Sequence, residues 1–206
     1  MRAYPRAVLY GVEMVGVVAF AASGVVASRA KRPDVIGALI LAFATALGGG
    51  VLRDAILGVP AQTFRDGWYL VAILAGAGAA LHAPSAIARL GSTLKVADAI
   101  GLGLFNAAGM LKAYASGSVS PAFAVVLGAI TGSGGGILRD VLCGEMPTVL
   151  RPGELYVTTC LAGGVAGLAA LAAGASLGLA SAIIAGVTIG FRLLAIRFEW
   201  HLPELR

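Results

Sequence analysis

The chain has 206 residues, of which 59% are hydrophobic and only 12% are charged, and it contains 30 glycines. Soluble domains carry roughly twice that charged fraction, so the composition excludes an ordinary soluble protein and predicts an all-α membrane protein. The net charge of +5 needs no nucleic acid, because basic residues beside membrane helices fix their orientation. Neither a basic stripe nor interleaved aromatic residues suggest contacts with bases. We therefore expect membrane lipids, and no nucleic acid, as partners.

The residues that usually bind metals or perform catalysis are scarce. Cys143 and Cys160 are seventeen positions apart and have no metal-ligand spacing around them, and His82 and His201 stand alone. The sequence therefore lacks the residues that would form a zinc site or a histidine-based triad. We expect no metal site, no cofactor and no enzymatic activity.

Apolar segments predict seven transmembrane helices, since about 20 apolar residues cross a bilayer. They cover residues 7–27, a segment from residue 35 onward, residues 68–81, residues 98–115, a segment from residue 122 onward, residues 155–173 and residues 177–196. The first segment could pass for a signal peptide, but Glu13 interrupts it and it matches a segment deep inside the chain. We therefore predict that it is the first membrane helix.

A run of three glycines followed by an Arg-Asp pair occurs twice, in the second and fifth segments. The copies are Gly48-Gly49-Gly50-Val51-Leu52-Arg53-Asp54 and Gly134-Gly135-Gly136-Ile137-Leu138-Arg139-Asp140. Each glycine forfeits about 1 kcal/mol of helix propensity relative to alanine, and an Arg or Asp at bilayer depth costs about 2.5 to 3.5 kcal/mol. The sequence therefore predicts that these two helices break at the triple glycines, and that the motif builds a site.

The repeat extends beyond the glycines. Glu13 aligns with Asp98 at an offset of 85 residues, the glycine motifs align at 86, and Tyr69 aligns with Tyr156 at 87. Each copy holds three predicted helices, and an odd number requires the second copy to insert upside down, as in the inverted repeats of many transport proteins. We expect a 3+3 inverted repeat plus one helix: residues 1–92, residues 93–174, and residues 175–206 as the seventh helix and cytoplasmic tail.

The basic residues predict the orientation of this multi-pass chain. Four lie on the amino-terminal side and nine on the other, when Arg53 and Arg139 are left out as intramembrane residues. The four are Arg2, Arg6, Arg65 and Lys112, and the nine are Arg29, Lys31, Arg32, Arg89, Lys95, Arg151, Arg192, Arg197 and Arg206. Since basic residues collect in the cytoplasm, we expect the amino terminus outside and the carboxyl terminus inside a cell (inner) membrane.

A broken helix would present free carbonyl groups and free N–H groups side by side, and such backbone is tolerated in a membrane only where it lines a cavity or is buried in protein. The candidate pore or ion-binding residues are Gly48, Gly49, Gly50, Arg53, Asp54, Gly134, Gly135, Gly136, Arg139, Asp140, Thr45, Thr131 and Ser133. Glu13, Asp98 and Lys112 are weaker candidates for a pore mouth. Each of these residues also has an interpretation that involves no pore. The charged residues could pair with one another near the lipid headgroups, and Lys112 could extend its charge to the membrane surface from a helix end. The glycines could serve only to pack helices together.

These motifs carry a resemblance over nearly the whole chain. The other stretches that carry it are Phe20-Ala21-Ala22-Ser23-Gly24, Thr45-Ala46-Leu47, Asp98-Ala99-Ile100-Gly101-Leu102, and the tail from Arg192 to Phe198 with Trp200, Leu202 and Pro203. The chain resembles the bacterial branch of the trimeric intracellular cation channel family, also described as uncharacterised membrane proteins with a paired glycine-transporter-like domain. The resemblance implies a homotrimer of seven-helix subunits, each conducting K⁺ and Na⁺ through its own pore between the repeats. The Lys-Glu-Val motif of the animal members is not evident, although Lys112 lies nearby.

Two function classes remain open from the residues themselves. Arginines and helix amino termini favour a carboxylate, whereas carbonyl ends and Asp54 and Asp140 favour a cation, so a site with both would suit a small zwitterion. The alternative to a monovalent cation channel is therefore a secondary transporter of glycine or another small zwitterion. A purely structural membrane protein would leave the duplicated charges unexplained. The resemblance favours the channel.

Overall fold

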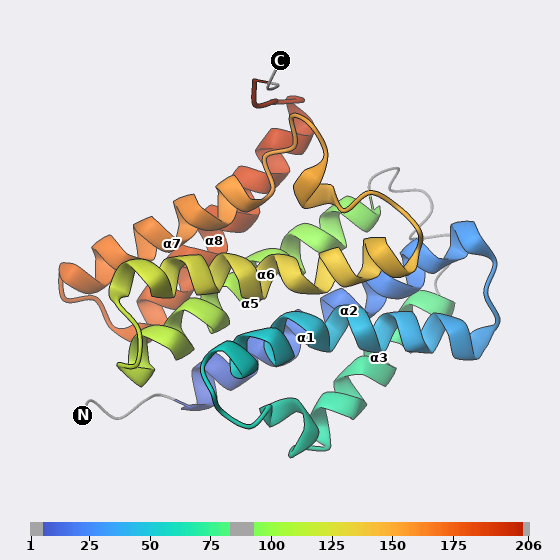
Figure 1. Cartoon of the computed structure of the whole chain (residues 1–206), viewed down its shortest axis with the longest axis horizontal. Coiled ribbons are helices and arrows are strands. Elements are labelled where there is room, and N and C mark those ends of the chain that lie inside the picture. The colour runs from blue at the N-terminus through green and yellow to red at the C-terminus, as the bar shows by residue number, and fades with distance from the viewer. Residues whose placement is uncertain (1–5, 83–92, 204–206) are drawn as a thin grey trace.

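The computed structural model describes residues 6–82 and 93–203, and within them the chain folds into seven α-helices joined by short loops (Figure 1). The helices are α1 (Arg6–Ser28), α2 (Val35–Ile56), α3 (Trp68–His82), α5 (Thr93–Ser116), α6 (Pro121–Leu142), α7 (Val157–Ala172) and α8 (Leu177–Arg197). Three short 3₁₀ turns lie between them, at Arg29–Lys31, Gln62–Phe64 and Thr148–Leu150. Arg2, Arg89 and Arg206, which entered the charge count, lie outside the described residues. The all-helical fold that the sequence predicts is confirmed.

Local signals explain where several helices begin and end. The side chains of Asp34, Ser120 and Ser176 accept hydrogen bonds from backbone N–H groups in the first turns of α2, α6 and α8, which satisfies donors that have no partner inside the helix. The chain leaves α2 and α6 through Gly58 and Gly144, whose φ angles are +66° and +68°. Glycine adopts this left-handed conformation without steric strain, so it suits the end of a helix.

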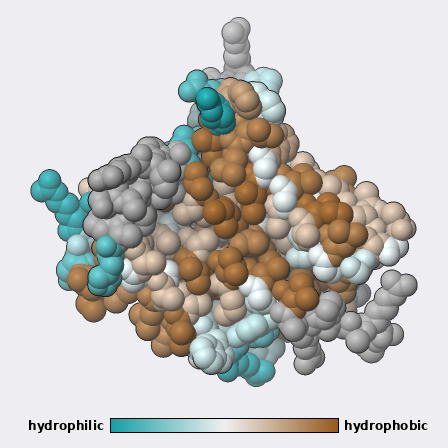
Figure 2. All heavy atoms as spheres, turned by 180° about the vertical axis from the view of Figure 1, so that it is seen from behind, coloured by the Kyte–Doolittle hydropathy of each residue, from teal (hydrophilic) through white to brown (hydrophobic). Residues whose placement is uncertain are grey.

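In the part of the chain that the structure describes, five helical segments are long and apolar enough to cross a membrane. They are Val8–Lys31, Val35–Ile56, Leu94–Ser116, Pro121–Leu142 and Leu177–Arg197, whereas α3 and α7 are apolar but shorter, with 15 and 16 residues. Large apolar side chains such as Val15, Ile40 and Val165 are mostly exposed. Figure 2 shows such side chains across the middle of one face, with hydrophilic residues toward its rims. An apolar exterior of this kind identifies a multi-pass membrane protein.

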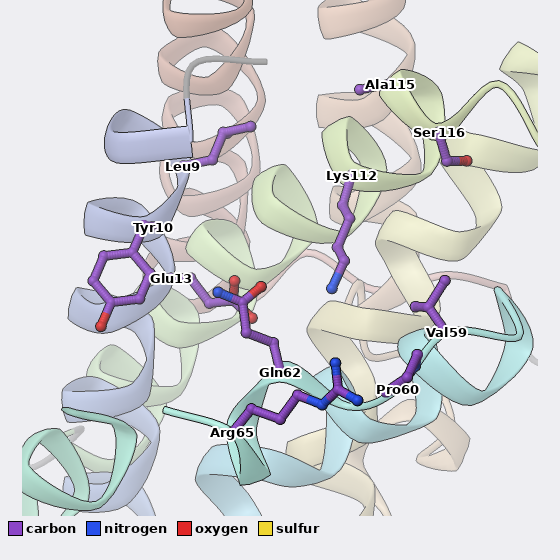
Figure 3. Close-up of a pocket in the computed structure, with 10 residues that line it drawn as sticks. All are labelled: Leu9, Tyr10, Glu13, Val59, Pro60, Gln62, Arg65, Lys112, Ala115 and Ser116. Atoms are coloured by element: carbon purple, nitrogen blue, oxygen red, sulfur yellow. The ribbon is translucent and has the colours of Figure 1, made fainter. Parts of the chain in front are cut away.

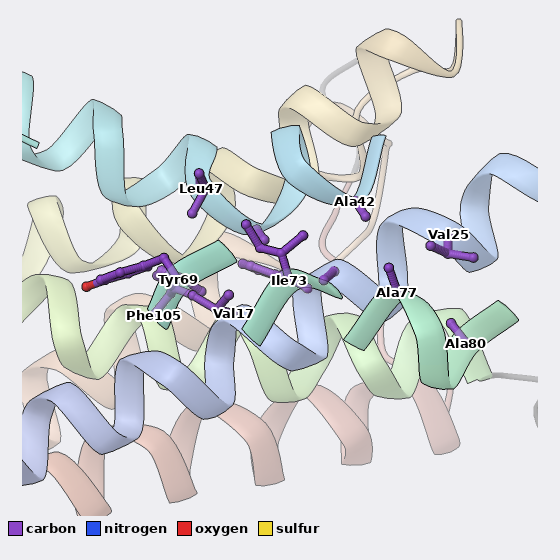
Figure 4. Close-up of a cluster of buried hydrophobic side chains, with 12 residues drawn as sticks. Val17, Val25, Ala42, Leu47, Tyr69, Ile73, Ala77, Ala80 and Phe105 are labelled. Atoms are coloured by element: carbon purple, nitrogen blue, oxygen red, sulfur yellow. The ribbon is translucent and has the colours of Figure 1, made fainter. Parts of the chain in front are cut away.

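Helix α5 occupies the centre, where it packs against α1, α6 and α8, while α1 also packs against α2 and α3. One buried cluster joins α1, α2, α3 and α5 through Val17, Leu47, Ile73 and Phe105 (Figure 4). Many of the other core side chains are alanines, which allow helix backbones to approach closely. This packing encloses the segments that carry the two glycine motifs.

The prediction that the second and fifth helices break at the triple glycines is wrong. Helices α2 and α6 continue through Gly48–Gly50 and Gly134–Gly136 without interruption, so the expected free carbonyl and N–H groups do not form there. The reason is that tertiary packing supports most of a helix and overrides weak intrinsic propensity. Here the glycines bring α2 and α6 into direct contact.

Candidate functional site

Helices α2 and α6 cross at their triple glycines. A Cβ atom on Gly49 would overlap the carbonyl oxygen of Thr131, and one on Gly135 would overlap the carbonyl oxygen of Thr45. A Cβ atom on Gly134 would lie 3.0 Å from the Cα atom of Gly49, and one on Gly48 would overlap the side chain of Leu138. Only glycine permits this approach, so the middle glycines are packing residues at the crossing.

The hydroxyl groups of the three candidate ion-binding residues already have hydrogen-bond partners at this crossing. Thr45, Thr131 and Ser133 are buried, and each hydroxyl donates to the carbonyl oxygen four residues earlier in its own helix, at 2.6, 2.6 and 2.7 Å. The threonine side chains fill the spaces beside Gly24 and Gly109, where Cβ atoms would collide with them. The structure therefore places these residues at the predicted level, with their hydroxyl protons bonded within their helices.

The third glycine of the first motif leaves room for a cluster of charged residues. A Cβ atom on Gly50 would lie 3.7 Å from Oε1 of Glu13. Arg53 donates from Nη1 to this oxygen at 3.1 Å and from Nε to Oδ1 of Asp54 at 2.7 Å, while Lys112 donates from Nζ to the same Asp54 oxygen at 2.7 Å. Arg53 and Asp54 are fully buried. We call Glu13, Arg53, Asp54 and Lys112 the Arg53 cluster.

The second motif carries a matching cluster on the other helix. Arg139 pairs from Nη1 with Asp98, donates from Nε to Oδ1 of Asp140 at 2.9 Å, and donates to the hydroxyl of Ser23 at 2.7 Å. Arg139 is 2% exposed. Asp140 also accepts from the backbone N–H and the hydroxyl of Thr148, at 2.8 and 2.9 Å. We call Ser23, Asp98, Arg139 and Asp140 the Arg139 cluster.

The two clusters lie on opposite sides of the glycine crossing. Lys31, just before α2, donates to Glu145, just after α6, at 2.8 Å, so the two helices run antiparallel. Arg53 and Arg139 each follow the middle glycine of their motif by four residues, which is about 6 Å along a helix. Because the helices run in opposite directions, one cluster flanks each side of the crossing.

A large pocket opens beside the Arg53 cluster. Its volume is about 740 Å³, and its lining includes Glu13, Lys112, Tyr10, Gln62 and Arg65 (Figure 3). In the figure the side chains of Lys112 and Arg65 approach the opening from opposite sides, and Glu13 lies at its inner wall. Tyr10 donates to Asp66 at 2.7 Å, which ties the loop before α3 to α1. Polar and charged groups therefore line a path from the surface to the buried Arg53 cluster.

A small pocket of about 90 Å³ lies beside the Arg139 cluster. Asp98, Arg139 and Asp140 line it together with Glu154 and Arg192. Arg192 is 3% exposed and binds Glu154 through an ion pair of 2.7 Å. Polar residues thus reach both sides of the crossing, although the two openings differ strongly in size.

Sequence reasoning missed four residues of this arrangement as site residues: Ser23, Glu154, Tyr156 and Arg192. The Tyr156 hydroxyl lies against Gly136, 2.6 Å from the position of a Cβ atom there. Tyr156 is also aligned with Tyr69 in the repeat, and Ser23 belongs to the repeated stretch before Gly24. The repeat therefore held a usable signal for Tyr156, whereas Ser23 aligns with Ala108 and was not marked by it. Arg192 lies in the unrepeated helix, so the repeat did not mark it as a site residue, although it begins the tail that carries the family resemblance.

Comparisons with known proteins agree on one family. A protein-family model described as glycine transporter matches residues 10–84 and 95–172. The UPF0126 inner membrane protein YadS of Escherichia coli is 39% identical over 199 residues, covering 95% of this chain and 95% of that protein. The TRIC trimeric intracellular cation channel orthologue of Rhodobacter sphaeroides is 31% identical, with a TM-score of 0.85 over 93% of this chain and 98% of that one. A second structure, which describes the structural basis for conductance through TRIC cation channels, is 35% identical. Its TM-score is 0.81, over 95% of this chain and 96% of that one.

Proposed function

The chain belongs to the bacterial branch of the trimeric intracellular cation channel family, and on this premise we propose that it conducts K⁺ and Na⁺ through a pore inside each subunit. The family consists of membrane proteins and channels, so the expectation that the chain is not an enzyme is confirmed. The single observation that carries the proposed pore is the series of large pocket, Arg53 cluster, glycine crossing, Arg139 cluster and small pocket.

Ion passage follows from the charges along this series. The carboxylates of Glu13, Asp54, Asp98 and Asp140 attract cations into a region where an unaccompanied ion would be costly. The two arginines hold those carboxylates, so a passing cation competes with a fixed guanidinium for the same oxygens. In the proposed pore, the close contact between Gly49 and Thr131 separates the two pockets. Conduction therefore requires α2 and α6 to separate at the crossing.

The two halves support an inverted repeat. The pairs Arg53–Glu13 and Arg139–Asp98 match each other, as do the contacts of Gly49 and Gly135. We assign residues 1–92 and 93–174 to the repeats, and residues 175–206 to the additional helix and tail. Two inverted repeats place their shared site near the midplane of the bilayer. We assign this position to the glycine crossing.

Orientation and assembly belong to the same proposal. Lys95, Arg151 and Arg192 line the small pocket, whereas Arg65 and Lys112 line the large one. By the positive-inside rule, the small pocket and the carboxyl terminus face the cytoplasm, and the large pocket and the amino terminus face outward. The relatives favour a cell inner membrane and a homotrimer, with lipids around it.

Recording from purified protein in planar bilayers tests the function. We expect unitary K⁺ currents that reverse at the K⁺ equilibrium potential, because a channel passes ions without a conformational cycle for each ion. Asp54→Asn and Asp140→Asn remove cation-attracting charges and should lower the unitary conductance or the preference for cations. Asp34→Asn, at the surface before α2, is the control and should conduct as the unaltered protein does. If neither Asp54→Asn nor Asp140→Asn changed the unitary conductance or the preference for cations, the assigned pore would be wrong.

A second candidate function rests on the small pocket. Its volume of about 90 Å³ and its mixed lining of arginines and carboxylates suit a small zwitterion such as glycine. The carboxylate of the ligand would face Arg151 or Arg192, and its ammonium group would face Asp98 or Asp140. Saturable uptake of radiolabelled glycine without unitary currents, measured on the same preparation, would favour this carrier over the channel.

A further inference from the structure

The small pocket is bordered by α8, which has no counterpart in the first half of the chain. Arg192 of α8 pairs with Glu154 through Nη2 and Oε2 at 2.7 Å, and its Nη1 donates to the carbonyl oxygen of Leu155 at 3.2 Å. The guanidinium carbon lies over the ring of Tyr156, 5.1 Å from its centroid. A nearly buried cation is thus fixed at the opening next to the Asp98–Arg139 pair.

The segment after α8 folds back and holds the backbone that carries Glu154 (Figure 1). The N–H group of Leu202 donates to the carbonyl oxygen of Gly153 at 3.0 Å, and Glu154 and His201 form an antiparallel bridge. Gly153 has a φ of +81°, and a Cβ atom on it would lie 2.9 Å from Cδ2 of His201. The ring of Trp200 packs edge-on against Phe191, with centroids 6.1 Å apart.

We propose that the C-terminal tail, residues 199–203, clamps Glu154 and Arg192 in place, and that Arg192 is the residue that restricts cation passage at the small pocket. The tail fixes the backbone of residues 153 and 154, Glu154 holds the guanidinium, and the positive charge closes the opening beside Asp98. Release of the tail frees Glu154 and lets Arg192 leave. The effect on currents rests on the proposed cation channel, whereas the effect on access to the pocket does not.

Access to the small pocket tests the clamp without any current. Leu94, which lines this pocket, is replaced by cysteine in protein whose Cys143 and Cys160 are changed to alanine, and a charged thiol reagent is applied in lipid nanodiscs. Leu202→Pro removes the N–H donor to Gly153 and should raise the labelling rate roughly three- to tenfold, the range expected for one lost hydrogen bond. Leu202→Ala keeps the donor and should label at the original rate.

Gly153→Ala provides an independent release of the tail, and Gly174→Ala is its matched control. Both glycines have positive φ angles, +81° and +87°, but a Cβ atom on Gly174 meets nothing within 4 Å. Labelling of Leu94→Cys should rise in Gly153→Ala and stay unchanged in Gly174→Ala. Equal labelling rates in Leu202→Pro, Gly153→Ala and their controls would overturn the clamp.

Single-channel recording then tests the role of Arg192. The two pockets differ in charge and size, so the unaltered channel should pass unequal currents at equal positive and negative voltages in symmetric KCl. Arg192→Gln should bring this ratio toward one, and Arg192→Lys should preserve it. Arg197→Gln, on the same helix but outside the pocket, is the control. Absence of currents in the unaltered protein contradicts the channel and leaves the labelling result to decide the clamp. If Arg192→Gln left the ratio of currents at positive and negative voltage unchanged, Arg192 would not be the residue that restricts cation passage.

Discussion

The Arg53 cluster and the Arg139 cluster share one plan and differ in one basic residue. In each, an arginine binds the aspartate that follows it and a carboxylate from a neighbouring helix, Glu13 in one and Asp98 in the other. Asp54 additionally accepts from Lys112 of α5. The position aligned with Lys112 in the first repeat is Ala27, so the second cluster receives no equivalent lysine.

This difference changes the charge balance at the two openings. The Arg53 cluster contains two basic and two acidic side chains, whereas the Arg139 cluster contains one basic and two acidic side chains. Each aspartate accepts one backbone N–H, Asp54 from Gln62 and Asp140 from Thr148, and the Thr148 hydroxyl adds one neutral donor to Asp140. Arg192 supplies a positive charge across the small pocket. The repeat therefore fixes the common backbone plan, and single residues outside its symmetry make the two openings chemically different.

Removing each arginine should give the largest effect and should separate the clusters. Arg139→Met leaves two buried carboxylates without a direct basic partner and should destabilise the protein by about 3 to 5 kcal/mol. Arg53→Met should destabilise less, because Lys112 still binds Asp54. The measurement is the unfolding midpoint in detergent, with Arg197→Met as an exposed control that should change little.

The comparison becomes sharper with Lys112 removed as well. The double substitution Arg53→Met and Lys112→Met turns the first cluster into an isolated pair of acids, and its midpoint should fall to that of Arg139→Met. A double substitution no less stable than Arg53→Met alone would show that Lys112 does not stabilise the cluster. The assignment of the charge difference to Lys112 would then be wrong.

The sequence marked Arg53-Asp54 and Arg139-Asp140 as candidate site residues because the motif that contains them is repeated, and it gave their pairing with each other only as an alternative. It also named Glu13, Asp98 and Lys112 as weaker candidates, since charges within apolar segments need partners. It could not say that Arg53 pairs with Glu13, 40 positions away, or that Lys112 reaches Asp54, 58 positions away. Such pairs depend on how helices pack, and helical periodicity carries no information about which neighbour a helix takes.

At the triple glycines the sequence led to a definite prediction, and the structure contradicts it. Propensity alone predicted a break, yet each glycine faces a different surface: Gly49 meets a backbone oxygen of α6, and Gly50 leaves room for Glu13. Their function is set by tertiary contacts that a single sequence does not display. Arg192 was missed for a related reason, since it lies in the helix that has no repeat partner.

Alanine at the middle glycines should have an intermediate effect that is equal in the two halves. Gly49→Ala and Gly135→Ala each force a Cβ atom onto a backbone oxygen, and such overpacking destabilises by about 1 to 3 kcal/mol. Gly78→Ala and Gly190→Ala are the controls, because a Cβ atom there meets nothing within 4 Å. They should leave the midpoint unchanged or raise it, since alanine favours a helix by about 1 kcal/mol. Equal midpoints in all four variants would contradict the close crossing.

The smallest expected effect distinguishes two carboxylates in loops, the exposed Glu145 and the partly buried Asp66. A hydrogen bond from Lys31 holds the pKa of Glu145 below its usual value, and a hydrogen bond from the Tyr10 hydroxyl does the same for the pKa of Asp66. Because both pKa values are lower in the folded state, both ionised groups stabilise the fold above their unfolded pKa values, about 4.3 and 3.9. This stability is lost as the pH falls through the folded values. Glu145→Gln and Asp66→Asn should therefore lower the midpoint slightly at pH 7 and not below the folded pKa values.

Salt separates these two contacts because only one of them joins opposite charges. Lys31 and Glu145 are about half exposed and 2.8 Å apart, and in 1 M salt the screening length falls to about 3 Å. The effect of Glu145→Gln at pH 7 should shrink in 1 M KCl. Tyr10 is a neutral donor, so the effect of Asp66→Asn should persist under the same conditions. The check is the difference in midpoint between each variant and the unaltered protein at low and high salt. If both differences fell together, the Tyr10–Asp66 contact would owe its stability to another charge, and the contrast between a charged and a neutral donor would be wrong.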